Sequence, residues 1–317
     1  MAQYTTLTQQ EIETIAAEFS IQNMYSFKVL SGGSENTNYL LKAEKGNFVL
    51  TICEQKTEQK AKELAHLLEY FYEQGFRSSI VIRNIKNEPI SLWGKKPIMV
   101  KKFLEGKVID DLSNHLLELV GCEIGKLHKI EVPKYLPKQL AVGWQQFGEV
   151  KKYAPDSTFE SWLNEMLDYV SPYFQTNLPK ALNHTDIFSN NVIISNDEST
   201  ATIMDFEEAT NYYRIFDIGM TIIGSCSNKK SINHEKVKHL LIGYNKEIQL
   251  LEVEIDALHA FTVYAGTTMT FWRHLNFNYT VPTPNMSDHY LGLKVLTDDM
   301  KSQPTDYFHK MIEEISS

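Results

Sequence analysis

The sequence predicts an α+β protein with a small sheet-containing N-terminal lobe and a larger, mainly helical C-terminal lobe. Short runs rich in β-branched and aromatic residues alternate with turn signals over the first third of the chain. Apolar residues recur at helical spacing over most of the rest. The pattern changes after Leu104-Glu105-Gly106, so we expect lobes over residues 1–103 and 104–317. A chain of 317 residues is long enough for two such units.

The N-terminal lobe is expected to be an antiparallel sheet of about five strands flanked by helices. Ile12, Ile15 and Phe19 fall on one helical face, and Gly75 ends a second helical pattern. The turn Glu44-Lys45-Gly46-Asn47 separates two β-rich runs and suits a hairpin. The predicted helices are 8–19 and 57–74, and the strand-like runs are 25–30, 37–42, 47–53, 79–83, 89–93 and 97–103.

The C-terminal lobe has one β-like segment among helical patterns at 114–129, at 158–174 and after residue 233. In this segment Asn191 precedes the apolar run 192–194, and turn residues follow. A second apolar run returns and ends at Asp205. The resulting hairpin would place Asn191 beside Asp205.

This segment carries the residue types that phosphoryl transfer needs. The amide oxygen of Asn191 and the carboxylate of Asp205 are hard ligands that suit Mg²⁺. Asp186, five residues before Asn191, could accept a proton from an attacking hydroxyl, and His184 could brace the loop through a backbone hydrogen bond. Such residues also occur in turns for local hydrogen bonding alone, but the joint pattern H-x-D-x4-N, hairpin, D-F is far more specific.

Composition excludes several other classes of protein. The net charge of −9 argues against a nucleic-acid-binding surface. The polar N-terminus does not look like a signal peptide, and no apolar run is long enough for a membrane span. Three distant cysteines form no metal or disulfide pattern and are typical of a reducing compartment. We therefore expect a cytoplasmic protein that binds neither nucleic acid nor membrane. We also expect a monomer or homodimer whose partner is a small molecule.

The string His184-Thr185-Asp186, four residues, Asn191 and then Asp205-Phe206 resembles the catalytic and metal motifs of the aminoglycoside phosphotransferase and choline kinase superfamily. That superfamily has a bilobal protein-kinase-like fold, and its usual string is H-G-D-x4-N followed by D-F. The resemblance implies that Asp186 is the catalytic base and that Asn191 and Asp205 bind the Mg²⁺ of Mg-ATP. Further along, Asp217 looks like the structural aspartate that braces the catalytic loop.

Two sets of strings indicate different members of this superfamily. GGSENTNYLL, GNFVLTICEQ and LPKALNHTDIFSNNVI resemble type II homoserine kinases, as does FWRHLNF followed by TVPTPNMSDHY. DFEEATNYYRIFDIG looks more like choline and ethanolamine kinases. The implied acceptor is the hydroxyl of L-homoserine or a similar amino alcohol. Choline, ethanolamine or an aminoglycoside is the alternative, and a non-catalytic nucleotide-binding pseudokinase is a second one.

The pseudokinase alternative arises because Thr51 stands where many members carry a strand lysine or arginine that reaches the phosphates. The phosphate cation must then come from elsewhere, and Lys42 on the neighbouring strand is a candidate.

Other nucleotide contacts are expected near the turn after the first strand and at the hinge. Backbone N–H groups of Gly32, Gly33 and Ser34 could cover the phosphates, because glycine permits close approach. The strand that carries Lys101 and Phe103 leads into the expected hinge, where backbone groups read adenine.

The acceptor should be recognised by the helical lobe. A homoserine carboxylate needs a cation, and Arg214 and Arg273 are the candidates, although each could instead form a structural salt bridge. A choline-like acceptor would need an aromatic box with acidic support. Glu207 could supply the charge, with Glu208 beside it. The candidate rings, which at helical spacing are typical of a core, are Tyr264, Phe271 and Trp272.

Overall fold

The computed structural model describes residues 5–30, 36–175, 177–228 and 230–316. The chain divides into two compact units, Met1–Glu105 and Gly106–Ser317. The predicted α+β class is confirmed, since an antiparallel sheet occupies the first unit and helices dominate the second. The predicted phosphate-covering residues Gly32, Gly33 and Ser34 lie outside the described residues.

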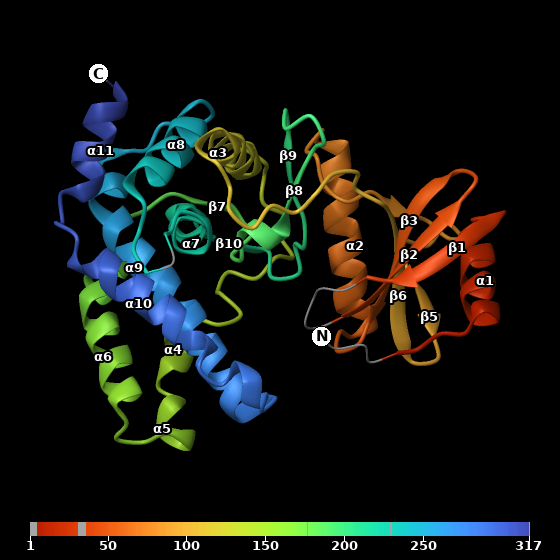
Figure 1. Ribbon diagram of the computed structural model, residues 1–317, viewed down its shortest axis with the longest axis horizontal. Coiled ribbons are helices and arrows are strands. Elements are labelled where there is room, and N and C mark those ends of the chain that lie inside the picture. Colours follow the sequence, from red (N-terminus) through yellow and green to blue (C-terminus); the bar gives the residue numbers. More distant parts are fainter. Residues whose placement is uncertain (1–4, 31–35, 176, 229, 317) are drawn as a thin grey trace. The chain divides into compact units, whose positions relative to one another are not determined.

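The first unit is a six-stranded antiparallel sheet placed between two helices (Figure 1). Its helices are α1 (Gln9–Glu18) and α2 (Glu58–Glu73). Its strands, in spatial order, are β1 (Met24–Val29), β2 (Asn36–Ala43), β3 (Gly46–Cys53), β6 (Lys96–Lys102) and β4 (Val81–Ile82), and β5 (Ser91–Trp93) also pairs with β6. Helix α1 begins where predicted because Thr8 and Glu11 form a capping box.

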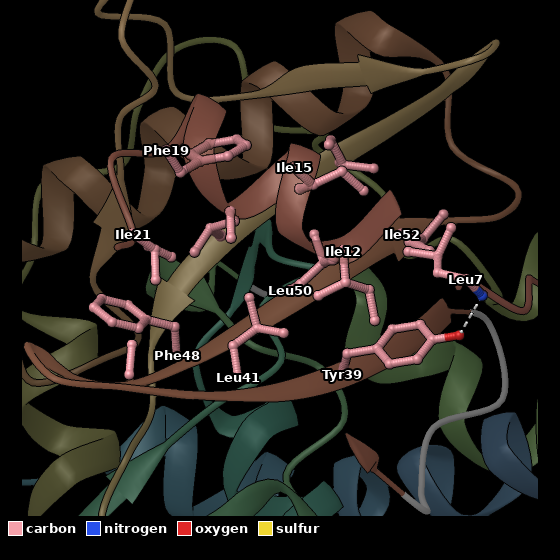
Figure 2. Packing of buried hydrophobic residues seen from close by; sticks show 14 residues of the cluster. Leu7, Ile12, Ile15, Phe19, Ile21, Tyr39, Leu41, Phe48, Leu50 and Ile52 are labelled. Atoms are coloured by element: carbon pink, nitrogen blue, oxygen red, sulfur yellow. Dashed lines mark hydrogen bonds between the residues drawn. The ribbon is translucent and has the colours of Figure 1, made fainter. Parts of the chain in front are cut away.

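One face of this sheet forms the core of the unit. Tyr39 and Leu41 of β2 and Leu50 and Ile52 of β3 point toward α1, as Figure 2 shows. The Tyr39 hydroxyl accepts a 2.9 Å hydrogen bond from the backbone N–H of Leu7, which ties the chain before α1 to the sheet. Because side chains alternate along a strand, the intervening residues of β2, β3 and β6 lie on the other face.

The second unit is a set of helices with two small two-stranded sheets (Figure 1). The helices are α3 (Asn114–His128), α4 (Trp144–Phe147), α5 (Val150–Tyr153), α6 (Thr158–Val170), α7 (Ile215–Ser225), α8 (His234–Asn245), α9 (Glu252–Leu275), α10 (His289–Ser302) and α11 (Tyr307–Ser316). The sheets are β7 (Lys180–Asn183) with β10 (Thr210–Tyr213), and β8 (Val192–Ile194) with β9 (Ala201–Ile203). Short π and 3-10 turns are Ser171–Gln175, Ser189–Asn191, Asn276–Thr280 and Pro284–Met286.

Close helix packing organises this unit. Helices α3 and α8 meet at two glycines, and a Cβ on Gly121 would lie 2.1 Å from the Leu240 carbonyl oxygen. The long helix α9 packs against α6, α7, α10 and α11. No helix of the described residues is long and apolar enough to cross a membrane.

Candidate active site

The predicted hairpin is present and brings Asn191 next to the segment that ends in Asp205. Val192 of β8 pairs with Ile203 of β9, and Asn191 accepts a 3.0 Å backbone hydrogen bond from Met204. Asp205 follows directly, with a left-handed backbone (φ 70°) that ends the strand. An aspartate tolerates this conformation better than most residues. The local sequence thus places two oxygen-bearing side chains at one end of a short ribbon.

Asn191 also fixes the position of Asp186. The buried Asn191 amide donates from Nδ2 to the backbone carbonyl of Asp186 at 2.8 Å and to its carboxylate Oδ2 at 3.1 Å. The Oδ1 atom of Asn191 has only a 3.5 Å contact from the amide of Asn190. Asn191 therefore orients Asp186 with its nitrogen and keeps its oxygen for another partner.

The electrostatic surroundings of Asp186 combine opposing effects. The pKa of this carboxyl is raised to about 6, chiefly by burial and also by the nearby charge of Asp205. The imidazole of His184, the Asn191 hydrogen bond and the charge of Arg273 act in the opposite direction. Asp186 is thus a half-buried carboxyl between an acidic and a basic neighbour, where its pKa is set by environment rather than by sequence.

His184 braces the loop, as the sequence predicted, and it does so with both ring nitrogens. Nδ1 accepts a 3.2 Å hydrogen bond from the Asp186 N–H, and Nε2 donates at 2.8 Å to the Met204 carbonyl. The ring is fully buried and packs edge-on against Phe206, with centroids 4.7 Å apart. Because both nitrogens are used by the backbone, His184 positions Asp186 rather than exchanging protons with a ligand.

Asp217 holds the same loop from α7. Its fully buried carboxylate accepts 2.7 Å hydrogen bonds from the backbone N–H groups of His184 and Thr185. These two bonds confirm the predicted bracing role. His128 of α3 lies against the same carboxylate, with Nε2 3.3 Å from Oδ2, and its Nδ1 is 3.0 Å from the Tyr244 hydroxyl. No local pattern indicated this contact, because it joins residues 89 positions apart.

Thr185 stands where the resembling family has glycine, and its backbone is left-handed (φ 73°). A β-branched residue in this region is strained by roughly 1–2 kcal/mol. Its hydroxyl donates a 3.1 Å hydrogen bond to the Glu208 carbonyl. His184 and Thr185 therefore bind the chain on both sides of Asp205, at Met204 and at Glu208.

The two candidate arginines have different environments. Arg214 donates to both carboxylate oxygens of Glu254, at 2.6 and 2.5 Å, and Glu254 is fully buried. The two donors, Nε and Nη2, are thus bound to Glu254 and do not offer this two-point contact to a ligand carboxylate. Arg214 therefore forms a structural ion pair, and this corrects the expectation that it binds substrate.

Arg273 lies near Asp186, close enough for each charge to shift the other's pKa. Burial lowers the pKa of this half-buried guanidinium, and the Asp186 carboxylate opposes that effect. It stacks over Phe188, 5.6 Å from the ring centroid, and its charge helps to lower the pKa of His289. Its guanidinium forms no hydrogen bond and no ion pair with the described residues.

The expected aromatic box is part of the core. Tyr264 and Phe271 are almost completely buried within α9, and the Tyr264 hydroxyl accepts a hydrogen bond from the Trp144 N–H. Trp272 is half-buried and packs against Phe277. These rings pack against the protein itself, as their helical spacing suggested. Glu207 is half-buried two positions after Asp205, and its substrate role stays a prediction.

The predicted nucleotide residues of the first unit lie at the end of its sheet. Lys42 is exposed on β2, and Lys101 is half-buried on β6. Phe103 follows β6 and donates its N–H to the Asn47 carbonyl at 3.0 Å. Thr51 is buried on β3 and donates its hydroxyl to Asn38 at 2.7 Å.

Comparisons with known proteins agree with these features. A family described as the phosphotransferase enzyme family (APH) matches residues 26–244. A homoserine kinase of Paramagnetospirillum magneticum is 26% identical over 325 aligned positions, covering 98% of this chain and 95% of that protein.

Two solved structures share the fold at low identity. The amicoumacin kinase hAmiN in complex with AMP-PNP and Ca²⁺ has a TM-score of 0.72 at 16% identity, covering 96% of this chain and 97% of that one. A choline/ethanolamine kinase family protein from Mesorhizobium loti has a TM-score of 0.67 at 15% identity, covering 96% and 98%. The expected protein-kinase-like fold is thereby confirmed. Because the family match spans well over half of the chain, the chain belongs to the phosphotransferase enzyme family and is an ATP-dependent small-molecule kinase.

Proposed function

We propose that this kinase phosphorylates the hydroxyl of L-homoserine or of a closely similar amino alcohol that carries a carboxylate. The observation that carries the proposal is Arg273, a half-buried cation beside Asp186 with no acidic partner among the described residues. A cation removed from water without a carboxylate of its own is costly unless a ligand supplies the anion.

In this proposal Asp186 orients the acceptor hydroxyl and takes its proton. Phosphoryl transfer requires mainly positioning and charge stabilisation. Asn191 donates a hydrogen bond to the Asp186 carboxylate, and Asp217 accepts hydrogen bonds from the two preceding backbone N–H groups. Together these bonds hold the Asp186 carboxylate in one place. A fixed carboxylate loses little entropy when the acceptor binds, so the hydroxyl can be held in line with the phosphate.

The donor atoms at the end of the ribbon fit a magnesium ion. Asn191 has its amide nitrogen bound to Asp186 and offers Oδ1, and the exposed Asp205 offers a carboxylate. Two hard oxygen ligands that leave the remaining positions to water and phosphate suit Mg²⁺. Bound there, the ion would neutralise charge on the phosphates of ATP.

The acceptor class follows from the charge that Arg273 offers. A guanidinium binds a carboxylate through two parallel hydrogen bonds, which favours an amino acid over a simple amino alcohol. The curated relatives named homoserine kinases support the same acceptor. Of the rings considered for a choline box, Tyr264 and Phe271 lie in the core, and Trp272 packs against Phe277.

The test compares two acceptors that differ only in the carboxylate: L-homoserine and the amino alcohol that remains when its carboxylate is removed. ADP release is measured with Mg-ATP for the unchanged protein, for Arg273→Met and for the control Arg77→Met on the exposed surface of the first unit. Loss of a charged hydrogen bond is expected to raise KM for homoserine about 10- to 100-fold in Arg273→Met. The decarboxylated acceptor should be affected little.

The acceptor panel also includes L-threonine, choline, ethanolamine and an aminoglycoside. Turnover of choline or ethanolamine with none on homoserine would overturn the proposal. An equal effect of Arg273→Met on both matched acceptors would remove the assignment of the carboxylate to Arg273.

A further inference from the structure

The first unit lacks a basic residue at the buried β3 position that Thr51 occupies, and the Thr51 hydroxyl is already bound to Asn38. ATP nevertheless carries several negative charges that a kinase must stabilise. We propose that Lys101 of β6 supplies this charge, binding the phosphates of the nucleotide from the strand next to Thr51. The proposal rests on the ATP-dependent activity of the chain and is independent of the acceptor.

Strand register places Lys101 on the same sheet face as Thr51. Leu50 of β3 and Val100 of β6 are paired and belong to the core under α1. Their neighbours along each strand must point to the opposite face, because side chains alternate. Thr51 and Lys101 are both such neighbours, so they share the face that lies away from α1.

The pairing also makes Lys101 the nearest lysine to Thr51 on that face. Thr51 pairs with Met99, and Lys101 is two residues further along β6, opposite Val49. Diagonal neighbours of this kind are roughly 7–8 Å apart, which a long side chain can bridge. The ammonium group of Lys101 can therefore reach the part of the sheet face that Thr51 occupies.

The other lysines on this face are further from Thr51. Lys42 pairs with Asn47, four residues along β3 from Thr51, and at a rise of about 3.3 Å per residue this is roughly 13 Å. Lys28 pairs with Leu40 and lies on β1, two strands away from β3. Neither position reaches Thr51 as directly as Lys101 does.

Two lysines from other parts of the unit are held by carboxylates of the protein. Lys96 forms an ion pair with Glu54, and Lys60 forms one with Glu63 on its own helix at 2.9 Å. The side chain of Lys101, by contrast, makes no hydrogen bond or ion pair with any residue in the described part of the chain. It is also half-buried, whereas Lys42 and Lys28 are exposed. An ammonium group that is partly removed from water and unpaired is suited to an anionic ligand.

The surroundings of Lys101 suit the rest of a nucleotide. Val49 lies directly opposite Lys101 in the same cross-strand row and is half-buried, so it presents apolar surface next to the charge. Such a surface can pack against a base while the ammonium group binds the phosphates. The row therefore combines the two chemical properties that distinguish ATP from a simple anion.

The test measures binding of ATP, ADP and adenosine by titration calorimetry, with Mg²⁺ in constant excess and no acceptor. Lys101→Met keeps the length of the side chain and removes the charge. Loss of a charge-assisted contact is expected to weaken ATP about 10- to 100-fold and to leave adenosine unchanged. Lys28→Met is the matched control on the same face and should stay within about threefold of the unchanged protein. Lys42→Met tests the rival lysine and should weaken ATP less than Lys101→Met does. Lys101→Arg should keep most of the ATP affinity.

Three results would overturn the proposal: unchanged ATP affinity in Lys101→Met, an equal loss for adenosine, or a larger loss in Lys42→Met. Thermal unfolding of each variant separates loss of the fold from loss of binding, and Lys101→Gln replaces Lys101→Met if the latter is unstable. Since no acceptor is present, failure of the homoserine proposal cannot produce any of these outcomes.

Discussion

The loop around Asp186 and the sheet face around Lys101 treat their polar groups in opposite ways. In the loop, His184 uses both ring nitrogens, Asp217 uses both carboxylate oxygens, and the backbone on both sides of Asp205 is bound. On the sheet face, the side chain of Lys101 has no polar partner among the described residues. The side chains of the loop are fixed by the protein's own hydrogen bonds. The ammonium group of Lys101, which we propose binds ATP, has no such bonds.

Arg214 and Arg273 repeat this contrast within the second unit. Arg214 is bound to the buried carboxylate of Glu254, and Arg273 lies near Asp186 without an ion pair in the described chain. The comparison predicts that changes in fixed groups will lower stability, and that changes in unpaired groups will lower binding or turnover while stability is kept.

The largest effect is expected for Asp186→Asn. The amide cannot take the acceptor proton, so kcat should fall about a hundred- to ten-thousand-fold while ATP still binds. Turnover and ATP affinity are measured together, with Asp197→Asn, in the exposed hairpin turn, as the control that keeps wild-type turnover. Equal turnover in Asp186→Asn and the unchanged protein would remove the base assignment.

Arg214→Met and Arg273→Met provide the sharpest form of the comparison. Arg214→Met leaves the buried Glu254 carboxylate unpaired and should cost about 3–5 kcal/mol of unfolding free energy. Arg273→Met strands no carboxylate and should change stability little. Urea denaturation of both variants measures this difference. If both lose stability equally, Arg273 is also a structural residue and the contrast fails.

Asp217→Asn should have an intermediate effect. One of the two backbone N–H groups, of His184 or Thr185, loses its acceptor in a fully buried site, which costs about 1–3 kcal/mol. Because the same bonds position Asp186, kcat should fall together with the melting temperature. A variant that melts earlier but keeps full turnover at a permissive temperature would show that this brace serves the fold alone.

The smallest effect is expected at Thr185. Thr185→Val keeps the branched shape and the left-handed strain but loses the hydrogen bond to the Glu208 carbonyl, so it should lose about 1 kcal/mol of stability. Thr185→Ser keeps the donor with less strain and should match or slightly exceed the unchanged protein. Denaturation midpoints of the three proteins decide this, and a Val variant as stable as Ser would mean that the hydroxyl contributes nothing.

Local features were predictable from the sequence. Helix α1 lies where the apolar spacing indicated, and the ribbon of β8 and β9 brings Asn191 toward Asp205. The predicted end of the helix over 158–174 was wrong, because α6 stops at Val170 and a 3-10 turn follows. Serine and proline after Val170 favour such a change of helix type.

What the sequence by itself determined was the order of the elements and the set of candidate site residues, because periodicity, caps and turns act over a few neighbouring positions. Only the tertiary structure decided which partner each residue has. It paired Arg214 with Glu254 and left Arg273 without an ion pair in the described chain, and it brought His128 to Asp217. It also set Lys101 diagonally across from Thr51 on a neighbouring strand. Such contacts join residues tens of positions apart, and they depend on packing of the whole unit that no short stretch of sequence encodes.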